Sequence, residues 1–147
     1  MLKFIKLLVF IIFFSSAAFA TYSIAPVKLI VTPDNKVTSL EFRNDNNENK
    51  KFQVTVLEVI KQGNKEIFKE TKEIVAAPLM FALPSGGTQT IRVESKSGNE
   101  LNGRDFKLSI KELDIRKSKK SLNVIHVIPE FRIPVVSKDM KDEHVSE

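Results

Sequence analysis

The residue types that could perform chemistry are few in this sequence. Histidine occurs only at His126 and His144, and cysteine is absent. His126 falls in a segment expected to be a strand and His144 in a polar tail, so neither has the neighbours of a metal site. The carboxylates of Glu41 and Asp45 suit a strand face and a turn, and Gly86-Gly87 lacks the lysine and helix of a phosphate-binding loop. The sequence therefore predicts no catalytic residue, no metal site and no cofactor, and we expect a protein that is not an enzyme.

The beginning of the sequence has the pattern of a secretory signal peptide. Two lysines precede an uninterrupted apolar run over residues 7–14, and small residues follow, ending in Ala18-Phe19-Ala20. The apolar run is shorter than the roughly 20 residues that a membrane-spanning helix needs, which argues against a membrane anchor. We expect residues 1–20 to be cleaved off on export to the periplasm, leaving Thr21 as the first residue.

Composition limits the partners and the sources of stability. The net charge is +5, and the lysines are scattered among acids, as in Lys69-Glu70-Thr71-Lys72-Glu73. Such mixed charge is typical of a solvated face, so no nucleic-acid partner is expected. Without cysteine there is no disulfide, and an exported chain must be stabilised by packing alone.

Short segments rich in Val, Ile, Phe and Thr recur between turn signals, and helical periodicity is weak. This pattern predicts an all-β fold, an immunoglobulin-like seven-stranded β-sandwich over residues 21–137. The polar segment 138–147 is expected to be disordered. A proline-flanked segment lies at 77–84, and the seven strands are expected near residues 24–31, 38–43, 52–59, 67–68, 88–93, 106–113 and 122–136.

The last expected strand, 122–136, carries apolar residues on both faces, among them Val124, Ile125 and Val127. An exposed strand edge can hold a partner by adding one of its strands, and an unprotected edge also predicts weak self-association. The alternative is a strand buried inside the sandwich, which the spacing alone favours. Pro129 lacks an N–H group, and we expect it to weaken strand donation at that point.

One segment resembles a known family. The pattern Pro78-x-x-Phe81-x-Leu83-x-Ser85-Gly86-x-x-Gln89-x-x-Arg92 is similar to the signature of periplasmic pilus chaperones, the PapD-like family. Segments 23–31, 104–113 and 131–135 are similar to its first strand, a following strand and the end of its edge strand. The resemblance covers the N-terminal domain of that family. It implies structural roles for the signature residues Pro78, Phe81, Leu83, Gly86, Gln89, Arg92 and Glu112.

The resemblance also implies a function. In that family the first domain stabilises a pilin or fimbrial subunit by lending it an edge strand, and two cations anchor the subunit's C-terminal carboxylate. Those cations correspond to Lys28 and Arg132, and the edge contacts to Val124, Ile125 and Val127. The family usually has Arg first and Lys second, so the two are exchanged here, and only Arg grips a carboxylate with a planar fork. The implied partners are a pilin-type subunit and an outer-membrane usher.

The sequence departs from the family in three places. The family normally has a second β-domain, whereas this chain ends just after the first. Val136 stands where a basic residue often faces that second domain, and Ser85 replaces a proline. A single-domain variant and a remnant of a split two-domain chaperone therefore both remain open. So does another class of function, an exported immunoglobulin-like adaptor or structural domain that binds a folded partner.

Overall fold

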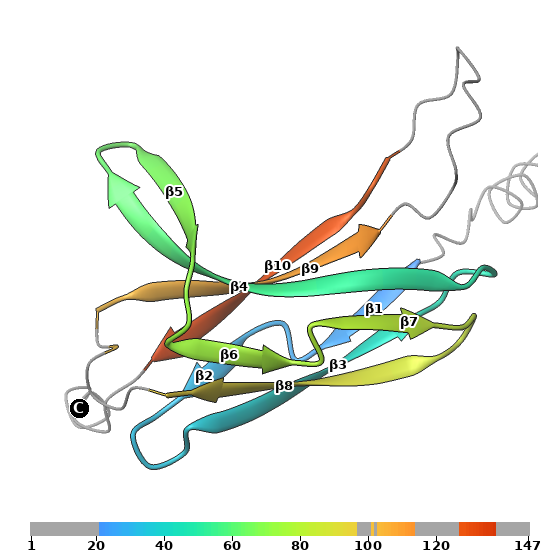
Figure 1. Ribbon diagram of the computed structural model, residues 1–147, viewed down its shortest axis with the longest axis horizontal. Helices are drawn as coiled ribbons and strands as arrows, with labels where there is room; N and C mark the ends of the chain where they lie inside the picture. Colours follow the sequence, from blue (N-terminus) through green and yellow to red (C-terminus); the bar gives the residue numbers. More distant parts are fainter. Residues whose placement is uncertain (1–20, 97–100, 102, 114–126, 138–147) are drawn as a thin grey trace, which may run out of the picture.

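The computed structural model describes residues 21–96, 101, 103–113 and 127–137 (Figure 1). The expected signal peptide, the polar tail, both histidines and the predicted contacts Val124 and Ile125 lie outside the described residues. The described part contains no α-helix and has ten strands. In chain order these are β1 (Tyr22–Ala25), β2 (Leu29–Val31), β3 (Val37–Asn44), β4 (Lys50–Gln62), β5 (Lys65–Glu70), β6 (Ile74–Ala77), β7 (Met80–Leu83), β8 (Thr88–Ser95), β9 (Asp105–Leu113) and β10 (Glu130–Ser137).

The strands form two sheets. A four-stranded sheet has the order β1-β3-β8-β6, and a six-stranded sheet has the order β2-β10-β9-β4-β5, with β7 also paired to β4. The two sheets pack face to face (Figure 1). All pairs are antiparallel except β2 with β10, which is parallel. The predicted immunoglobulin-like β-sandwich is confirmed.

Two segments cross between the sheets at prolines. β1 pairs with β3 in one sheet, and β2 pairs with β10 in the other, with Pro26 between them. In the same way β6 pairs with β8, and β7 pairs with β4, with Pro78 between them. Both prolines follow cis peptide bonds. Proline cannot donate to a ladder, so it suits the point where the chain leaves a sheet. The first predicted strand thus becomes two and the proline-flanked segment adds two more, giving ten strands where the sequence predicts seven.

The core lies between the sheets and follows the alternation of the strands. Leu40 and Phe42 of β3 are buried, as are Phe52, Val54 and Val56 of β4. An aromatic cluster occupies one end of the sandwich, with Phe42 and Phe52 4.8 Å apart between ring centroids. Its members are Tyr22, Phe42, Phe52, Phe81 and Phe131.

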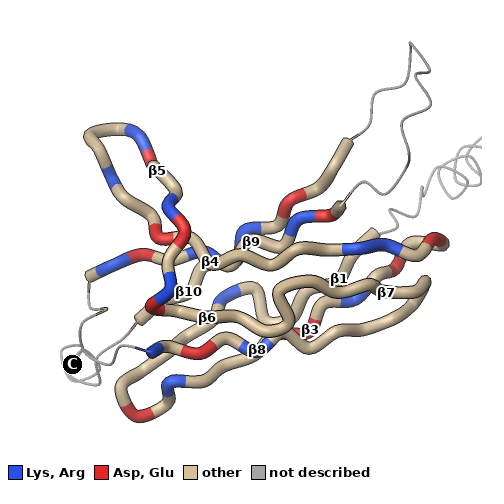
Figure 2. Tube along the Cα trace, in the orientation of Figure 1, with Lys and Arg blue, Asp and Glu red and all other residues tan. Residues whose placement is uncertain are grey.

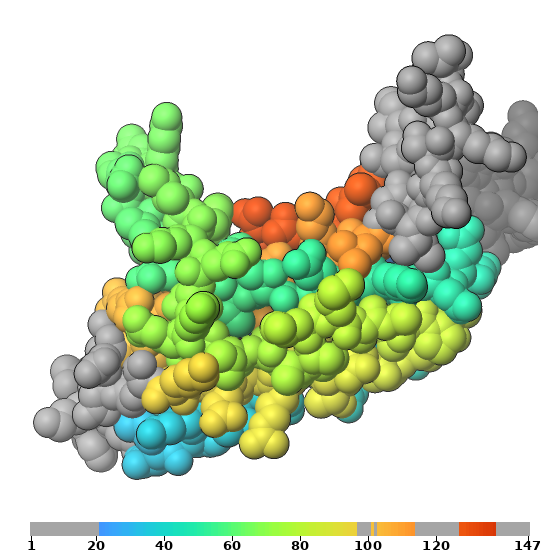
Figure 3. Space-filling view, viewed as in Figure 1, coloured from blue at the N-terminus to red at the C-terminus, as the bar shows by residue number. Residues whose placement is uncertain are grey.

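The β4–β5 hairpin stands away from the body of the sandwich (Figure 1). It turns at Gly63, whose positive φ of 58° is a conformation that favours glycine. Basic and acidic residues follow one another along its β5 arm (Figure 2). In Figure 3 the hairpin forms one wall of a recess, and β10 is visible beside it.

Candidate functional site

The first half of β10 has an open edge. β10 pairs with β9 from Glu130 to Val136, but with β2 only over 135–137. Within the described ranges no strand pairs with the outer edge of residues 130–134. The Glu112 N–H donates to the Pro129 carbonyl at 3.0 Å, so Pro129 faces β9. Because successive residues of an antiparallel strand face opposite neighbours, the main-chain groups of Glu130 and Arg132 point toward the open edge.

The same alternation corrects the expected role of Pro129. Its carbonyl accepts a bond from β9, so its missing N–H is lost from the β9 side and not from the open edge. Pro134, two residues beyond Arg132, is the proline whose main chain faces outward. The prediction that Pro129 weakens strand donation is therefore wrong, and Pro134 limits the donors instead.

The predicted start of this strand also needs correction. β10 begins at Glu130, so residues 127–129 precede it and are not part of a strand. The side chain of Val127, a predicted edge contact, is 84% exposed. A proline at 129 cannot supply the ladder donor that would extend the pairing with β9, which explains why the strand begins one residue later. The available edge thus lies at residues 130–134.

The other sheet edges are less suited to strand addition. β5 forms the opposite edge of the six-stranded sheet and carries Lys65, Glu66, Lys69 and Glu70 in six residues. Charged side chains of this kind protect an edge strand from pairing with another chain. The remaining edge strands, β1 and β6 of the four-stranded sheet and β7 beside β4, are each only four residues long. The first half of β10 is the best candidate edge in the described part of the chain.

Arg132 lies on the outer face of β10 in a small polar cluster. Its Nε and Nη2 atoms contact the two carboxylate oxygens of Glu130 at 3.0 and 3.2 Å. Ser109 of β9 donates its hydroxyl to the same carboxylate at 2.7 Å. The Arg132 guanidinium also lies over the ring of Phe68, 4.4 Å from its centroid. The hydrogen bond from Arg132, followed by that from Ser109, lowers the pKa of Glu130, and the bond to Glu130 raises the pKa of Arg132. Both groups are therefore ionised at neutral pH.

Lys28, the other predicted cation, is exposed in the bend between β1 and β2. Leu29 pairs with Val135, so the preceding residue lies at the level of Pro134, two residues from Arg132 along the neighbouring strand. The register thus brings the backbones of the two predicted cations onto adjoining segments. That both side chains bind one carboxylate stays a prediction.

The inner face of the same strand is fixed by aromatic packing. The Phe131 ring lies 5.3 Å from Tyr22 and 5.6 Å from Phe42, between centroids. The Tyr22 hydroxyl donates to Glu112 at 2.5 Å, and Lys50 pairs with the other oxygen of Glu112 at 3.2 Å. Burial, and after it the bond to Glu112, raises the pKa of Tyr22. These contacts tie β1 of one sheet to β9 and β10 of the other.

The remaining signature residues lie away from β10. Phe81 stacks on another ring of the aromatic cluster, and Leu83 is buried. Gly86 has a positive φ of 71° in the turn before β8, a conformation that favours glycine. On β8, the Gln89 amide donates to the neighbouring Thr90 carbonyl at 2.8 Å, and Arg92 is exposed. Pro78 lies at the crossing between the sheets, and the structural roles that the resemblance implies for these residues stay a prediction.

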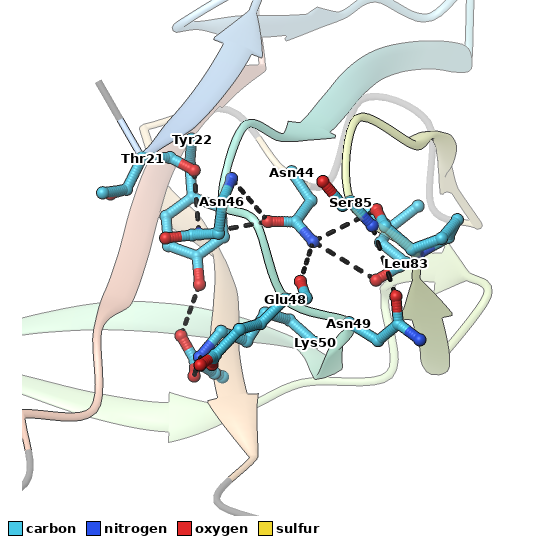
Figure 4. A network of polar contacts seen from close by, with 11 residues as sticks. Thr21, Tyr22, Asn44, Asn46, Glu48, Asn49, Lys50, Leu83 and Ser85 are labelled. Carbon is cyan, nitrogen blue, oxygen red and sulfur yellow. Dashed lines mark hydrogen bonds and ion pairs between the residues drawn. The ribbon is translucent and has the colours of Figure 1, made fainter. Parts of the chain in front are cut away.

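A second polar cluster surrounds Asn44, and the sequence shows it only as part of a polar turn. The Asn44 amide nitrogen donates to the carbonyls of Glu48, Leu83 and Pro84 at 2.8, 3.3 and 3.1 Å (Figure 4). Its amide oxygen accepts bonds from the backbone and side-chain nitrogens of Asn46, both at 3.1 Å. The side chain joins the β3–β4 turn to the end of β7. Asparagine in a turn is common, and nothing in the local sequence marks this one as buried.

In residues 21–96, 101, 103–113 and 127–137, no three carboxylate or histidine side chains are grouped closely enough to hold a metal ion. The same part of the chain has no helix with the length and apolar character needed to cross a membrane.

Comparison with known proteins decides the family. Residues 21–138 match the family described as pili and flagellar-assembly chaperone, PapD N-terminal domain. The chain belongs to this family. The resemblance inferred from Pro78 to Arg92 is confirmed, and the family is one of assembly chaperones and not of enzymes. No curated protein matched the sequence.

Solved structures support the fold of this PapD-type domain. The chain is similar to the CsuC–CsuE chaperone–tip adhesion subunit pre-assembly complex of Acinetobacter baumannii, with 18% identity and a TM-score of 0.67 over 82% of this chain and 58% of that chain. The Salmonella enterica SafA pilin–SafB chaperone complex gives 13% and 0.62 over 90% and 59%. The periplasmic chaperone SfaE gives 13% and 0.61 over 81% and 58%. The chain thus spans less than two thirds of the length of these structures.

Proposed function

We propose that this PapD-type domain is a periplasmic chaperone for a pilus or fimbrial subunit. It lends the open edge of β10 to the subunit and anchors the subunit's C-terminal carboxylate with Lys28 and Arg132. The observation that carries the proposal is the open edge of residues 130–134 next to Arg132, in a chain of this family. Two similar structures are named as complexes of a chaperone with a pilin or a tip subunit, which supports the same class of partner here.

The open edge and the cation have complementary tasks. Main-chain groups of Glu130 and Arg132 can hydrogen-bond an added strand of any sequence, which supplies affinity without selecting side chains. The guanidinium of Arg132 can hold a carboxylate through two parallel hydrogen bonds, which fixes where the added strand ends. Phe131 and Ile133 pack inward at the same level, so the edge is presented on a rigid support.

Export is part of the proposal. We place a signal peptide at residues 1–20, the chaperone domain at 21–137 and a polar tail at 138–147, with an outer-membrane usher as a second partner. The family match from residue 21 supports the first boundary. Amino-terminal sequencing of the exported protein should start at Thr21, and recovery of a membrane-embedded, uncleaved form as the main species would contradict this boundary.

The test is recovery of the partner from the periplasm. The full chain, carrying an affinity tag and expressed in its host, is purified and its bound proteins are identified by mass spectrometry. A β-sandwich subunit that lacks one strand supports the chaperone proposal. A complete, independently folded protein overturns it in favour of an adaptor.

Variants then test the anchor on the purified subunit complex. Arg132→Ala and Lys28→Ala should each weaken subunit binding roughly tenfold or more, because each removes a charge-assisted hydrogen bond. Lys36→Ala removes the same charge from the exposed loop before β3 and serves as the matched control. Equal affinities for all three variants would show that Lys28 and Arg132 do not anchor the carboxylate.

A further inference from the structure

Arg132 already holds a carboxylate, and that carboxylate belongs to its own strand. Glu130 lies two residues earlier on β10, so both side chains project from the same face. Glu130 engages Nε and Nη2 of the guanidinium at 3.0 and 3.2 Å, which is the two-point contact that a ligand carboxylate would make.

The neighbours of this pair hold it in place. Ser109 donates to Glu130 at 2.7 Å, and the ring of Phe68 lies under the guanidinium. On the same face Lys107 pairs with Glu66 at 3.0 Å and also lies over Phe68, 5.0 Å from its centroid. Arg132 thus occupies a defined position between an aromatic ring and an acid.

We propose that Glu130 is an internal occupant of the anion site formed by Nε and Nη2 of Arg132, and that a partner's carboxylate binds at that edge only by displacing it. This proposal rests on the proposed function, because it concerns what controls access to the same carboxylate site at Arg132. The side chains of Glu130 and Arg132 are 31% and 39% exposed, so the displaced Glu130 can return to water.

Displacement makes the site selective. A small free anion must outcompete a carboxylate that is held two residues away on the same strand and is present at every moment. A carboxylate at the end of an added strand is itself held at high effective concentration by the main-chain bonds along the open edge. Glu130 therefore favours partners that first pair with β10 and rejects free carboxylates.

The experiment uses acetate as the probe and the full mature chain labelled with nitrogen-15. The Arg132 Nε–H resonance reports directly which carboxylate occupies the site, because that N–H donates a hydrogen bond to Glu130. In Glu130→Gln, acetate should bind at Arg132 about threefold to fivefold more tightly than in the wild type, the range expected for removing an exposed ion pair. Glu66→Gln is the matched control. It removes one negative charge from the same face, next to Lys107, and should change acetate affinity at Arg132 less than twofold.

Equal or weaker acetate binding in Glu130→Gln overturns the proposal and makes Glu130 a residue that merely positions Arg132. An equal gain in Glu66→Gln also overturns it, because the effect would then be general charge. Failure of the wild-type chain to recover a subunit, together with the acetate gain in Glu130→Gln, would refute the chaperone function while leaving this assignment intact.

Discussion

The Asn44 cluster and the Glu130–Arg132 cluster differ in the partners of their hydrogen bonds. The Asn44 side chain is fully buried, and its amide nitrogen donates to backbone carbonyls from two separate turns. The Glu130–Arg132 cluster is partly exposed, and its hydrogen bonds join side chains only. Losing the first removes a donor from the buried Leu83 carbonyl, whereas losing the second leaves groups that water can solvate.

This difference indicates which cluster holds the fold and which can bind another molecule. Bonds from a buried side chain to the backbone of two turns fix the chain path, so they suit a residue that only holds the fold. Bonds between exposed side chains can be exchanged for bonds to another molecule at small cost. The Tyr22–Glu112–Lys50 cluster lies between these cases, since it is part-buried and its hydrogen bonds also join side chains.

The largest effect is expected at the buried cluster. Asn44→Ala should lower the free energy of unfolding by about 3 kcal/mol, because the buried amide takes part in five hydrogen bonds and one of its acceptors, the Leu83 carbonyl, is itself buried. Urea denaturation measures the change. For comparison, Asn46→Ala removes the half-buried amide that donates to Asn44 and to the Thr21 carbonyl, and should cost less, about 1 kcal/mol. A loss below that value in Asn44→Ala would mean that water replaces the amide.

An intermediate effect is expected at Tyr22. Tyr22→Phe should lower the free energy of unfolding by about 1–2 kcal/mol at pH 7, because the hydroxyl no longer bonds Glu112. The folded-state pKa of Tyr22 is raised, so its contribution is complete below the ordinary tyrosine pKa of 10.0 and is lost as the pH rises above it. Stability of the wild type should therefore fall more steeply in this alkaline range than that of Tyr22→Phe.

The same residue offers a direct optical check. Tyr22 is the only tyrosine of the sequence, so tyrosinate absorbance reports it alone. Its transition in the folded protein should lie at higher pH than in urea. Coincident transitions would show that the hydroxyl is solvated and the cluster open.

The smallest effect is expected at the exposed cluster. Glu130→Gln should change the free energy of unfolding by less than about 1 kcal/mol at pH 7. The folded-state pKa of Glu130 is lowered, so the wild-type advantage is present above the ordinary glutamate pKa of 4.5 and disappears as the pH falls through the folded-state value. Thermal unfolding of both chains from pH 7 to pH 3 follows it. A loss as large as that of Asn44→Ala would place Glu130 with the structural residues.

The sequence predicted the fold class because alternation and turn residues are local signals. The strands expected at 38–43 and 106–113, now β3 and β9, needed no tertiary information. The sequence did not predict the crossings at Pro26 and Pro78, because a proline shows that a ladder is interrupted but not that the chain changes sheets. The main-chain direction of Pro129 depends on its pairing with Glu112, which no local pattern specifies.

The candidate site divides in the same way. Lys28 and Arg132 came from the family resemblance, since a single exposed cation carries no signal of its own. Glu130 was missed because a carboxylate two residues from an arginine on a strand is common. Its role depends on two contacts that are distant in the sequence. Ser109, which bonds Glu130, lies 21 residues from it, and Phe68, which lies under the guanidinium of Arg132, is 64 residues from that arginine.

The crossing at Pro26 also sets the length of the open edge of β10. The first segment of the domain reaches the six-stranded sheet only at Leu29, opposite Val135, so the point of crossing decides how much of β10 stays uncovered. The uncovered stretch from Glu130 to Pro134 is about 17 Å long at the rise of an extended strand. Each residue by which the crossing moved toward the amino terminus would shorten the space for a visiting strand by one position.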